Sequence, residues 1–328
     1  MAVKKEMVLK NGRWVWFNGE FVPWEEAVVH VGTHALHYGS SIFEGIRSYA
    51  TARGPAIFCL DQHLDRLYGS CKIYRMEPPF PKDELKKAII ELVAKNEHEA
   101  CYIRPLVFRG LGSFSLDPRK DCPVEVVILT IEWGAYLGEE ALNHGVDVCV
   151  STWFRMAPNT YPALAKAGGH YTNSQLIAME AKDKGFVEGI ALDVFGYVSE
   201  GSGENLFIVQ DGVLYTPPLS ASILGGVTRR CVMALAEDLG IPVREELISR
   251  ERLYLADEAF FTGTAAEITP IRSVDGIPVG EGVRGPITRR LQEEFFGIVR
   301  GEIPDRHGWL TPVSTAANLR EGAQEKAA

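Results

Sequence analysis

One lysine in the second half of the chain has neighbours suited to covalent chemistry. Lysine is scarce there: after residue 133 only Lys166, Lys182, Lys184 and Lys326 occur. Lys166 stands among small residues in the segment 163–169, where a flat ligand could approach the backbone and a buried amine would hold its proton less tightly. Both properties suit a lysine that forms a Schiff base. An exposed lysine in a glycine-rich loop would have the same sequence, so the segment leaves both interpretations open.

A glycine pair that opens a predicted helix is a candidate phosphate site. Residues 224–228 read Leu-Gly-Gly-Val-Thr, and the helix that follows places Val232, Leu235 and Leu239 on one face. The amides and partial positive charge of a helix N-terminus bind phosphate, and glycine permits close contact. A purely structural turn could also begin with two glycines, so this segment is equally open.

The loop 196–205 carries three glycines and two glutamates, which is more glycine and acid than a simple strand connection needs. Glu200 in this loop has the charge to meet a cationic ring nitrogen. A tight surface turn with solvated glutamates is the alternative, and the loop by itself does not exclude it.

The elements that must position these residues fall into two domains, because 328 residues are long for a single core. We expect a small N-terminal α/β domain over residues 1–132. Asn11-Gly12 and Asn18-Gly19 are typical of hairpin turns, and Asp61 is suited to cap a helix. Periodicity predicts helices from Asp61 through Tyr74 and over 82–95, and strands near 101–109 and 124–132.

An interdomain loop is expected at residues 133–143, where two glycines and two aromatic residues break the periodicity. Residues 144–328 are expected to form a larger C-terminal domain that is barrel-like, with flanking helices. Its predicted strands lie near 146–153, 189–195, 205–209 and 258–262, and its predicted helices near 172–184, 226–239 and 286–299.

Composition narrows the class of protein. A hydrophobic fraction of 46% and a charged fraction of 23% are ordinary for a globular chain. The formal net charge of −9 argues against a nucleic-acid partner. No apolar run is long enough for a signal-peptide core or a membrane span, so we expect a cytoplasmic protein. The six cysteines are scattered singly, without the close pairs of a zinc or redox motif, and are expected to be reduced.

Several long segments, in order along the chain, resemble one family. The runs Tyr161 to Tyr171, Gly189 to Asn205 and Gly225 to Arg229 closely resemble the class IV (fold type IV) aminotransferases, specifically the branched-chain amino acid aminotransferases. The resemblance covers nearly the whole chain and also includes the segments 34–39, 43–47, 102–105 and 263–270.

This resemblance implies a two-domain α/β (α+β) enzyme of fold type IV that depends on pyridoxal 5'-phosphate. The implied reaction moves the amino group of L-leucine, L-isoleucine or L-valine to 2-oxoglutarate by a ping-pong mechanism, giving a branched-chain 2-oxo acid and L-glutamate. The resemblance also implies a homodimer, or a multiple of dimers, whose active site is shared between subunits.

The same resemblance assigns the cofactor-binding roles. It makes Lys166 the Schiff-base lysine and general acid/base, and it places Glu200 beside the pyridine nitrogen, where an ionised carboxylate keeps the ring protonated as an electron sink. Tyr171 matches the residue near the phenolate oxygen. The residues implied to hold the phosphate are Arg66, Gly226, Val227, Thr228 and Thr264.

The substrate-binding roles also follow from the resemblance. Apolar walls are expected from Phe43, Trp133 and Tyr136, and the neighbouring subunit would add Tyr38 and Leu116. Tyr38 and Arg104 would also receive the side-chain carboxylate of glutamate. The remaining expected substrate contacts are Gly45, Tyr102, Thr264, Ala265 and Ala266, of which the last three would present amides to the α-carboxylate.

The sequence departs from the family pattern in two places. The family often has proline at the position of Gly225, and the segment 109–114 follows the loop outline without its commonest residues. Cofactor binding is hardly affected by these changes. Ser113 and Phe114 would lie near the mouth of the pocket, however, where they could broaden or shift the side-chain preference.

Other members of the fold are rival interpretations. D-amino acid aminotransferases, R-selective amine transaminases and aminodeoxychorismate lyases share the lysine and phosphate elements. Tyr102-Ile103-Arg104 together with the segment 263–266 favours the branched-chain group over them. A cofactor-binding protein without turnover would require an unreactive Lys166.

Histidine spacing raises the question of a metal. His30, His34 and His37 would share one face of a helix, but no acidic or cysteine ligands accompany them. We therefore expect no metal site. The segment 110–112 is too short a glycine signal for a dinucleotide site, and no GxSxG serine motif occurs.

Overall fold

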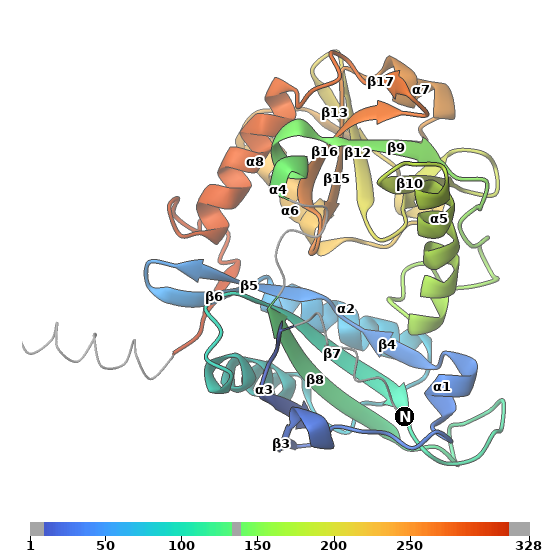
Figure 1. The fold of residues 1–328 in the computed structure, drawn as a ribbon, viewed down its shortest axis with the longest axis vertical. Helices are drawn as coiled ribbons and strands as arrows, with labels where there is room; N and C mark the ends of the chain where they lie inside the picture. The colour runs from blue at the N-terminus through green and yellow to red at the C-terminus, as the bar shows by residue number, and fades with distance from the viewer. Residues whose placement is uncertain (1–9, 133–138, 315–328) are drawn as a thin grey trace, which may run out of the picture. The chain divides into compact units, whose positions relative to one another are not determined.

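The structure is a computed structural model that describes residues 10–132 and 139–314 (Figure 1). The chain divides into two compact units, one formed by Met1–Gly134 with Val299–Ala328 and the other by Ala135–Ile298. Each unit is built around its own nine-stranded sheet. No helix within the described ranges is both long and apolar enough to cross a membrane.

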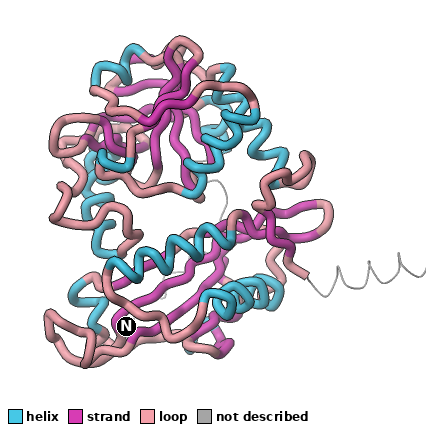
Figure 2. Tube along the Cα trace, turned by 180° about the vertical axis from the view of Figure 1, so that it is seen from behind, coloured by secondary structure: helices cyan, strands magenta, loops and turns pink. Residues whose placement is uncertain are grey.

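The first unit has a sheet whose main path runs β18-β6-β5-β7-β8-β2-β3, with β1 paired to β8 and β4 to β7. Helices α2 and α3 contact each other and lie across one face of this sheet (Figure 2). Both helices bury apolar residues at helical spacing, such as Leu64 and Leu67 in α2, which is why these segments are helical. The helical elements are η1 (Trp24–Glu26), α1 (His34–Tyr38), α2 (Leu60–Ile73) and α3 (Lys82–Lys95). The strands are β1 (Lys10–Asn11), β2 (Trp14–Phe17), β3 (Glu20–Pro23), β4 (Ser41–Phe43), β5 (Ile46–Thr51), β6 (Gly54–Phe58), β7 (Cys101–Arg109), β8 (Val124–Glu132) and β18 (Leu310–Pro312).

The second unit has a mixed sheet that curves into a half-barrel along the path β11-β10-β9-β16-β15-β12-β13-β14, with β17 paired to β16 (Figure 1). Buried aliphatic residues and Phe261 fill its core. The strands are β9 (Val146–Val150), β10 (Glu188–Leu192), β11 (Val198–Gly201), β12 (Asn205–Gln210), β13 (Val213–Thr216), β14 (Val243–Glu245), β15 (Glu258–Gly263), β16 (Glu267–Val274) and β17 (Ile277–Pro278). The helices are α4 (Glu139–His144), η2 (Gly168–His170), α5 (Tyr171–Asp183), η3 (Leu219–Ala221), α6 (Val227–Asp238), α7 (Arg250–Leu255) and α8 (Pro286–Val299).

The mixed α/β class and the barrel-like second sheet are confirmed, and most predicted elements lie within a few residues of their observed bounds. β7 and β8 have the predicted bounds, and α3 and α8 match the predicted helices. Asn18 and Gly19 form the turn between β2 and β3, with the positive φ angles of 48° and 101° that such a hairpin requires.

Two local predictions are wrong. Asn11-Gly12 does not turn a hairpin, because β1 and β2 both pair with β8 and the Gly12 amide donates to the Thr130 carbonyl at 3.0 Å. The chain therefore continues along the same strand. Asp61 does not cap α2, whose N-cap is Cys59; it lies in the first turn and accepts hydrogen bonds of 2.8 and 2.9 Å from Lys86.

The division of the chain also differs from the expected domains at two points. The expected loop 133–143 includes most of α4, whose Ala141 is buried in the core of the second unit. Near the C-terminus, β18 pairs with β6 of the first sheet, so the last described residues belong with the first unit rather than the second. A three-residue strand after a helix has too little periodicity to be recognised from sequence.

Candidate active site

Lys166 lies in the second unit, on the loop that leads into α5. Its neighbours Ala165 and Ala167 are buried and anchor the backbone, while Lys166 itself is half-buried. Nζ of Lys166 donates a hydrogen bond of 2.6 Å to Oη of Tyr171, the first residue of α5. The loop and the helix start therefore hold an amine and a phenol together.

Glu200 lies on β11, a strand whose four residues are all buried. Its Oε1 pairs with Nη2 of Arg155 at 2.8 Å, and its Oε2 accepts from Nδ2 of Asn205 at 3.0 Å and from the amide of Leu224 at 2.9 Å. All three contacting groups can only donate, which fits an ionised carboxylate. Burial raises the pKa of Glu200 above its ordinary value, although the charges of Arg155 and Lys166 partly offset that rise.

The glycine pair lies at the N-terminus of α6, as predicted. Gly226 is the N-cap residue and, as a glycine, has no side chain with which to cap the helix. The amides of the first turn are therefore not satisfied by a capping side chain. Val227 and Thr228 begin the helix and are buried. The arrangement suits an anion, because the helix dipole and its first amides point in the same direction.

Two more buried carboxyl groups lie near Glu200. Ser202 Oγ donates to Glu188 at 3.0 Å, and the Gly203 amide donates to Glu204 at 3.0 Å. Burial, followed by the charge of Glu188, raises the pKa of Glu204 well above its ordinary value. Two neighbouring buried carboxyls resist joint ionisation, and the pKa of Glu188 is likewise raised, first by its burial.

The turn between β15 and β16 carries Thr264, Ala265 and Ala266. Thr264 and Ala265 are half-buried, whereas Ala266 is buried and its carbonyl accepts a 2.6 Å hydrogen bond from Thr269 Oγ1. This bond anchors the turn from the strand side. The remaining accessible backbone of the turn can present amides to an anionic ligand.

In the first unit, Arg66 on α2 forms a two-point ion pair with the fully buried Glu44. Nε of Arg66 lies 2.6 Å from Oε1 and Nη2 lies 2.8 Å from Oε2. His63 Nδ1 is 2.8 Å from the same Oε2. Burial opposes ionisation of Glu44, but Arg66 and then His63 outweigh it and hold the pKa of this carboxyl well below its usual range. The glutamate thus fixes the position of the arginine.

Four predicted substrate residues of the first unit, one of which is Arg104, lie together. Nη2 and Nε of Arg104 donate to Oη of Tyr102 at 2.7 and 3.1 Å, and its guanidinium lies 4.4 Å from the centre of the Phe43 ring. A methyl group on Gly45 would lie 2.3 Å from the Tyr102 hydroxyl. Glycine therefore leaves the space that the tyrosine needs. Within the described residues, no carboxylate lies within ion-pair distance of Arg104.

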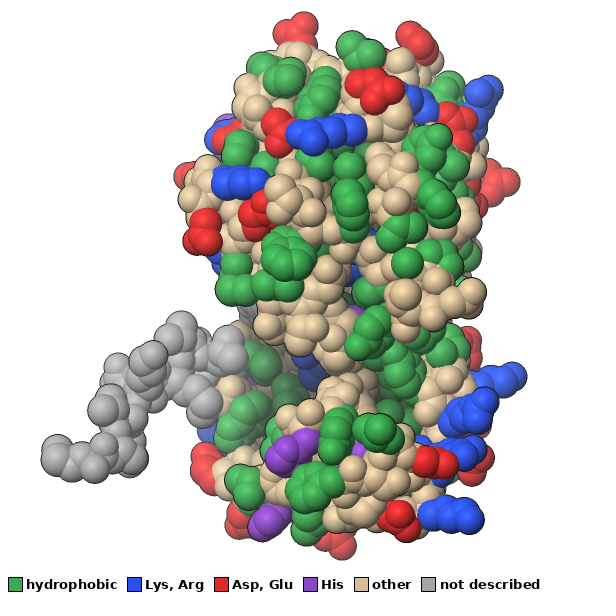
Figure 3. Space-filling view, turned by 90° about the vertical axis from the view of Figure 1, so that its right-hand side faces the viewer, with side chains coloured by type: hydrophobic (Ala, Val, Ile, Leu, Met, Phe, Trp, Pro, Cys, Tyr) green, Lys and Arg blue, Asp and Glu red, His purple; other side chains and the backbone are tan. Residues whose placement is uncertain are grey.

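Tyr38 and Leu116 lie on an exposed surface of the first unit, with 47% and 88% of their area accessible. Tyr38 Oη donates to the Phe114 carbonyl at 3.2 Å, which links α1 to the loop that carries Leu116. Figure 3 shows hydrophobic side chains and histidines gathered on this face of the unit. Further exposed apolar residues occur in α1 and just before it, and in the loop between β7 and β8 that carries Leu116. They are Val28, Val29, Val31, Leu36, Leu111 and Phe114. The predicted wall residues Trp133 and Tyr136 lie outside the described residues.

The three histidines do not share a helix face, because α1 begins at His34 and His30 precedes it. Each has its own polar contact. His30 Nδ1 accepts from the Gly32 amide at 3.0 Å, His34 is within 2.7 Å of Ser40 Oγ, and His37 Nε2 donates to the Val31 carbonyl at 2.9 Å. No group of three potential metal ligands occurs in the part of the chain that the structure describes.

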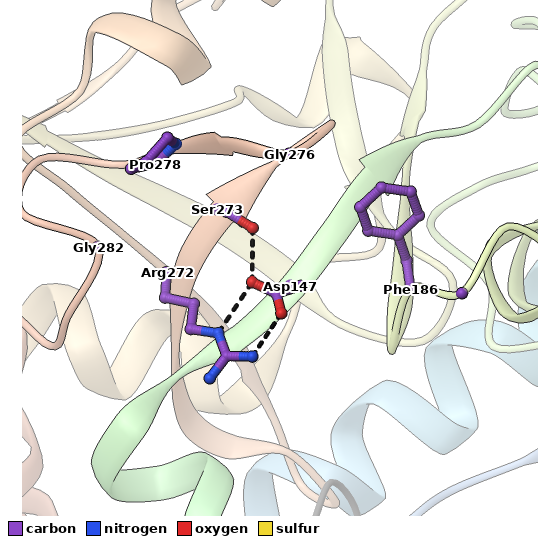
Figure 4. A pocket seen from close by; sticks show the side chains of 8 residues that line it. Asp147, Phe186, Arg272, Ser273, Gly276, Pro278 and Gly282 are labelled. Atoms are coloured by element: carbon purple, nitrogen blue, oxygen red, sulfur yellow. Dashed lines mark hydrogen bonds and ion pairs between the residues drawn. The ribbon is translucent and has the colours of Figure 1, made fainter.

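An open pocket of about 440 Å³ lies elsewhere on the second unit, between β9, β16 and the end of α5 (Figure 4). Its charged groups are Asp147 and Arg272, which pair with each other through both Asp147 oxygens, and Ser273 Oγ also donates to Asp147 at 2.6 Å. None of the predicted site residues lines it. Because its charges neutralise each other, the pocket indicates no ligand class.

Known proteins of the same kind match the chain over nearly its whole length. A family model described as amino-transferase class IV matches residues 41–274. The chain belongs to the class IV amino-transferases. The branched-chain-amino-acid aminotransferases of Salmonella typhimurium (strain LT2) and Escherichia coli (strain K12) are each 54% identical to it, over 94% of this chain and 100% of theirs.

Solved structures agree with this family membership. A crystal structure of the Escherichia coli branched-chain amino acid aminotransferase superposes with a TM-score of 0.91 at 54% identity, covering 92% of this chain and 100% of that one. The branched-chain amino acid aminotransferase from Thermobaculum terrenum, in its PLP-form, gives a TM-score of 0.87 at 37% identity, covering 93% of this chain and 99% of that one. The resemblance found in the sequence and the expected fold class are both confirmed.

Sequence reasoning gave no role to two residues that contact Glu200. Arg155 is a lone arginine among aromatic and small residues, 45 positions before its carboxylate partner, so nothing local marks it. A buried arginine needs an acid, but sequence does not say which one. Asn205 follows Glu204 in a loop whose pattern is dominated by glycines and acids, so its own sequence context does not mark it. An asparagine at the start of an otherwise apolar strand was the available signal.

Proposed function

We propose that this chain is a pyridoxal-phosphate-dependent aminotransferase that transfers the amino group of L-leucine, L-isoleucine or L-valine to 2-oxoglutarate. The observation that carries the proposal is the amine of Lys166, 2.6 Å from Tyr171 Oη and close enough to buried Glu200 for its charge to act on that carboxyl. Relatives named as branched-chain-amino-acid aminotransferases, at 54% identity over nearly the whole chain, support the substrate class.

The described residues of the second unit fit this cofactor by the chemistry of their groups. Lys166 is an amine suited to attach an aldehyde, Glu200 is a carboxylate suited to a protonated ring nitrogen, and the start of α6 is an uncapped helix N-terminus suited to phosphate. When bound, the cofactor withdraws electrons from the substrate Cα, so that the proton on this carbon can leave.

Lys166 would attach the cofactor and carry the proton to and from the substrate Cα. Tyr171 supports both tasks, since its hydroxyl holds Nζ in one position and can donate to the phenolate oxygen of the cofactor. Glu200 would keep the ring nitrogen protonated. Its contact with Arg155 supports this role, because the charge of the arginine favours the ionised carboxylate and offsets part of the rise in pKa that burial causes.

We propose that Gly226, Val227, Thr228 and Thr264 of the second unit bind the phosphate, and Arg66 of the first unit remains a predicted phosphate residue. The uncapped start of α6 supports the first three, and the Glu44 ion pair supports Arg66 by fixing the direction of its guanidinium. Several charge-assisted bonds of this kind, at roughly 1.5–3 kcal/mol each, would keep the cofactor bound between the two half-reactions.

For the substrate, we propose that Phe43, Gly45 and Tyr102 form an apolar pocket wall and that Arg104 binds the side-chain carboxylate of glutamate. The absence of an acidic partner for Arg104 among the described residues supports this assignment, because its charge remains available. Amides of Thr264, Ala265 and Ala266 would receive the α-carboxylate. Trp133 and Tyr136 remain predicted wall residues.

We further propose that the enzyme is a homodimer, or a multiple of dimers, in which Tyr38 and Leu116 serve the active site of the neighbouring subunit. Their high exposure on an apolar surface supports this role, since a second copy would cover that surface. We also propose a cytoplasmic location, supported by six buried cysteines that are all thiols rather than disulfides.

A donor panel with 2-oxoglutarate as acceptor tests the proposed reaction. L-leucine, L-isoleucine and L-valine are expected to react fastest, while L-phenylalanine, D-alanine and an R-configured amine react slowly. Fastest turnover of D-alanine or of the amine would instead assign the chain to one of those two transaminase types. Release of pyruvate from aminodeoxychorismate, without transamination, would assign it to the lyases.

A further inference from the structure

The side-chain amide of Asn205 joins Glu200 to the segment that leads into α6. Its Nδ2 donates to Glu200 Oε2 at 3.0 Å and to the Leu224 carbonyl at 2.9 Å. The amide of Leu224 donates to the same Glu200 oxygen at 2.9 Å. A closed set of three hydrogen bonds therefore connects the carboxylate on β11, the first residue of β12 and the backbone two residues before the Gly226 cap.

The side-chain oxygen of Asn205 explains why position 226 is occupied by glycine. A methyl group on Gly226 would lie 1.9 Å from Oδ1 of Asn205, a distance that no real pair of atoms adopts. The backbone of Gly226 has φ −61° and ψ 137°, which any residue can adopt. Glycine is required here by the close approach of Asn205 and not by backbone conformation.

Burial makes this arrangement strict. Asn205 is 5% exposed, and its two amide protons have two acceptors, so its Nδ2 group is fully satisfied. Aspartate at this position would have no proton to donate and would place a second carboxylate against Glu200. Alanine would leave the Leu224 carbonyl and one bonding direction of Glu200 without their buried donor.

We propose that Asn205 is a positioning residue that holds the Glu200 carboxylate and the N-terminal turn of α6 in one fixed arrangement, so that the ring nitrogen and the phosphate of the cofactor are bound together. The inference rests on the proposed function. Asn205 touches neither end of the cofactor in this scheme; it determines that the two binding groups are correctly placed at the same time.

The test compares two ligands that differ only in the phosphate. Apoenzyme is titrated with pyridoxal 5'-phosphate and with pyridoxal, and the dissociation constants are read from absorbance, without turnover. For Asn205→Ala we expect the affinity for pyridoxal 5'-phosphate to fall about 10- to 100-fold, as for the loss of two buried hydrogen bonds, and the affinity for pyridoxal to fall much less. Equal losses for both ligands would overturn the proposal, because Asn205 would then support only Glu200. Unchanged affinity for both would overturn it as well.

Asn205→Asp guards against a failure of the alanine variant to fold. It keeps the volume of the side chain, and we expect it to lose affinity for pyridoxal 5'-phosphate at least as strongly, again with a smaller loss for pyridoxal. Wild-type affinity for the phosphate ester in this variant would contradict the proposal. Failure of the wild-type protein itself to bind pyridoxal 5'-phosphate would instead reject the proposed function.

Asn96 in the first unit is a matched control. Its Nδ2 donates to the Trp14 carbonyl at 3.0 Å and to Thr130 Oγ1 at 2.8 Å, and a methyl group on Gly12 would lie 2.4 Å from that Nδ2. Asn96→Ala removes the same kind of contact far from Lys166 in the sequence. It should lower thermal stability and leave the ratio of the two dissociation constants unchanged. A matching fall in that ratio would show a general effect of destabilisation and overturn the proposal.

A steric test examines the same contact from the other side. Gly226→Ala should sharply weaken the binding of pyridoxal 5'-phosphate, because its methyl group collides with Asn205. In the Asn205→Ala background the 1.9 Å overlap is removed and Cβ of Arg229, at 3.1 Å, is the nearest remaining atom, so the added loss should be several-fold smaller. Equal losses in both backgrounds would contradict the contact on which the proposal depends.

Discussion

Each unit buries a glutamate against an arginine, but the two pairs are completed differently. Glu44 receives both contacts of Arg66 and a third from His63, and its pKa falls well below its usual range although burial opposes ionisation. Glu200 receives one contact from Arg155 and two from neutral groups, and burial raises its pKa. The same residue types thus give one carboxylate whose negative charge is fully balanced by its neighbours, Glu44, and one whose charge is balanced only in part, Glu200.

This difference separates a structural ion pair from a candidate catalytic group. A carboxylate whose pKa remains raised gains stability from any further cation, and a protonated ring nitrogen is such a cation. Glu44 has no comparable gain to make. Its contribution is to hold Arg66, whereas Glu200 is available to a ligand.

Among the variants that test this difference between Glu44 and Glu200, Glu200→Gln is expected to have the largest effect on the reaction. The variant should retain the cofactor and slow proton removal from the substrate Cα by about 10²–10³-fold, the usual cost of removing one group that stabilises developing charge. Single-turnover absorbance with L-leucine measures the step. Glu237→Gln, an exposed change on α6, should leave the rate unaltered. A normal rate in Glu200→Gln would mean that its raised pKa has no catalytic use.

Glu44→Gln should instead lower stability, by about 3–5 kcal/mol at pH 7, because Arg66 loses its buried counter-charge. The folded pKa of Glu44 is lowered, so its stabilisation is complete above its unfolded pKa of about 4.3 and is lost as the pH falls below that value. Urea unfolding at pH 7 and at pH 4 should show a gap between wild type and variant that narrows on acidification.

Asp117→Asn is the matched control for that experiment. Asp117 also makes a two-point pair with an arginine, Arg119, at 2.6 and 2.7 Å, but on an exposed loop. Solvent screens such pairs, so its loss should not change stability measurably. If both variants lost the same stability, burial of Glu44 would not explain its strength.

The smallest effect is expected from Arg104→Ala, which concerns an arginine without an acidic partner among the described residues. The half-reaction with 2-oxoglutarate should slow about 10- to 100-fold more than the half-reaction with L-leucine, because only the former has a second carboxylate to lose its partner. Timing each half-reaction separately measures the split. Arg47→Ala, which removes an arginine 5.4 Å from the Tyr49 ring, should affect both equally. Equal losses in Arg104→Ala would end its role in dual specificity.

Sequence patterns predicted the elements that have strong periodicity and flanking signals. The helices α3 and α8 and the strands β7 and β8 have long apolar stripes or runs, and the Asn18-Gly19 turn has its own chemistry. The wrong predictions concern which strand or side chain a segment pairs with. Asn11-Gly12 is a hairpin signal by type, but β8 is long enough to pair with both β1 and β2, so no reversal occurs.

The candidate site shows the same limit. The resemblance to a family is what predicts roles for Lys166 and Glu200, because the residues alone leave surface alternatives open. Arg155 and Asn205 contact Glu200 from positions that carry no local pattern. Which buried acid an arginine meets depends on how the sheet aligns distant strands, and single-residue chemistry does not encode that alignment.

The most direct test of the whole account is the chemical identity of the lysine that holds the cofactor. Holoenzyme is reduced with borohydride, digested and mapped by mass spectrometry. We expect the pyridoxyl group on the peptide that contains Lys166 and on neither Lys182 nor Lys184. A label on another lysine, or no label at all, would contradict the assignment of the active site.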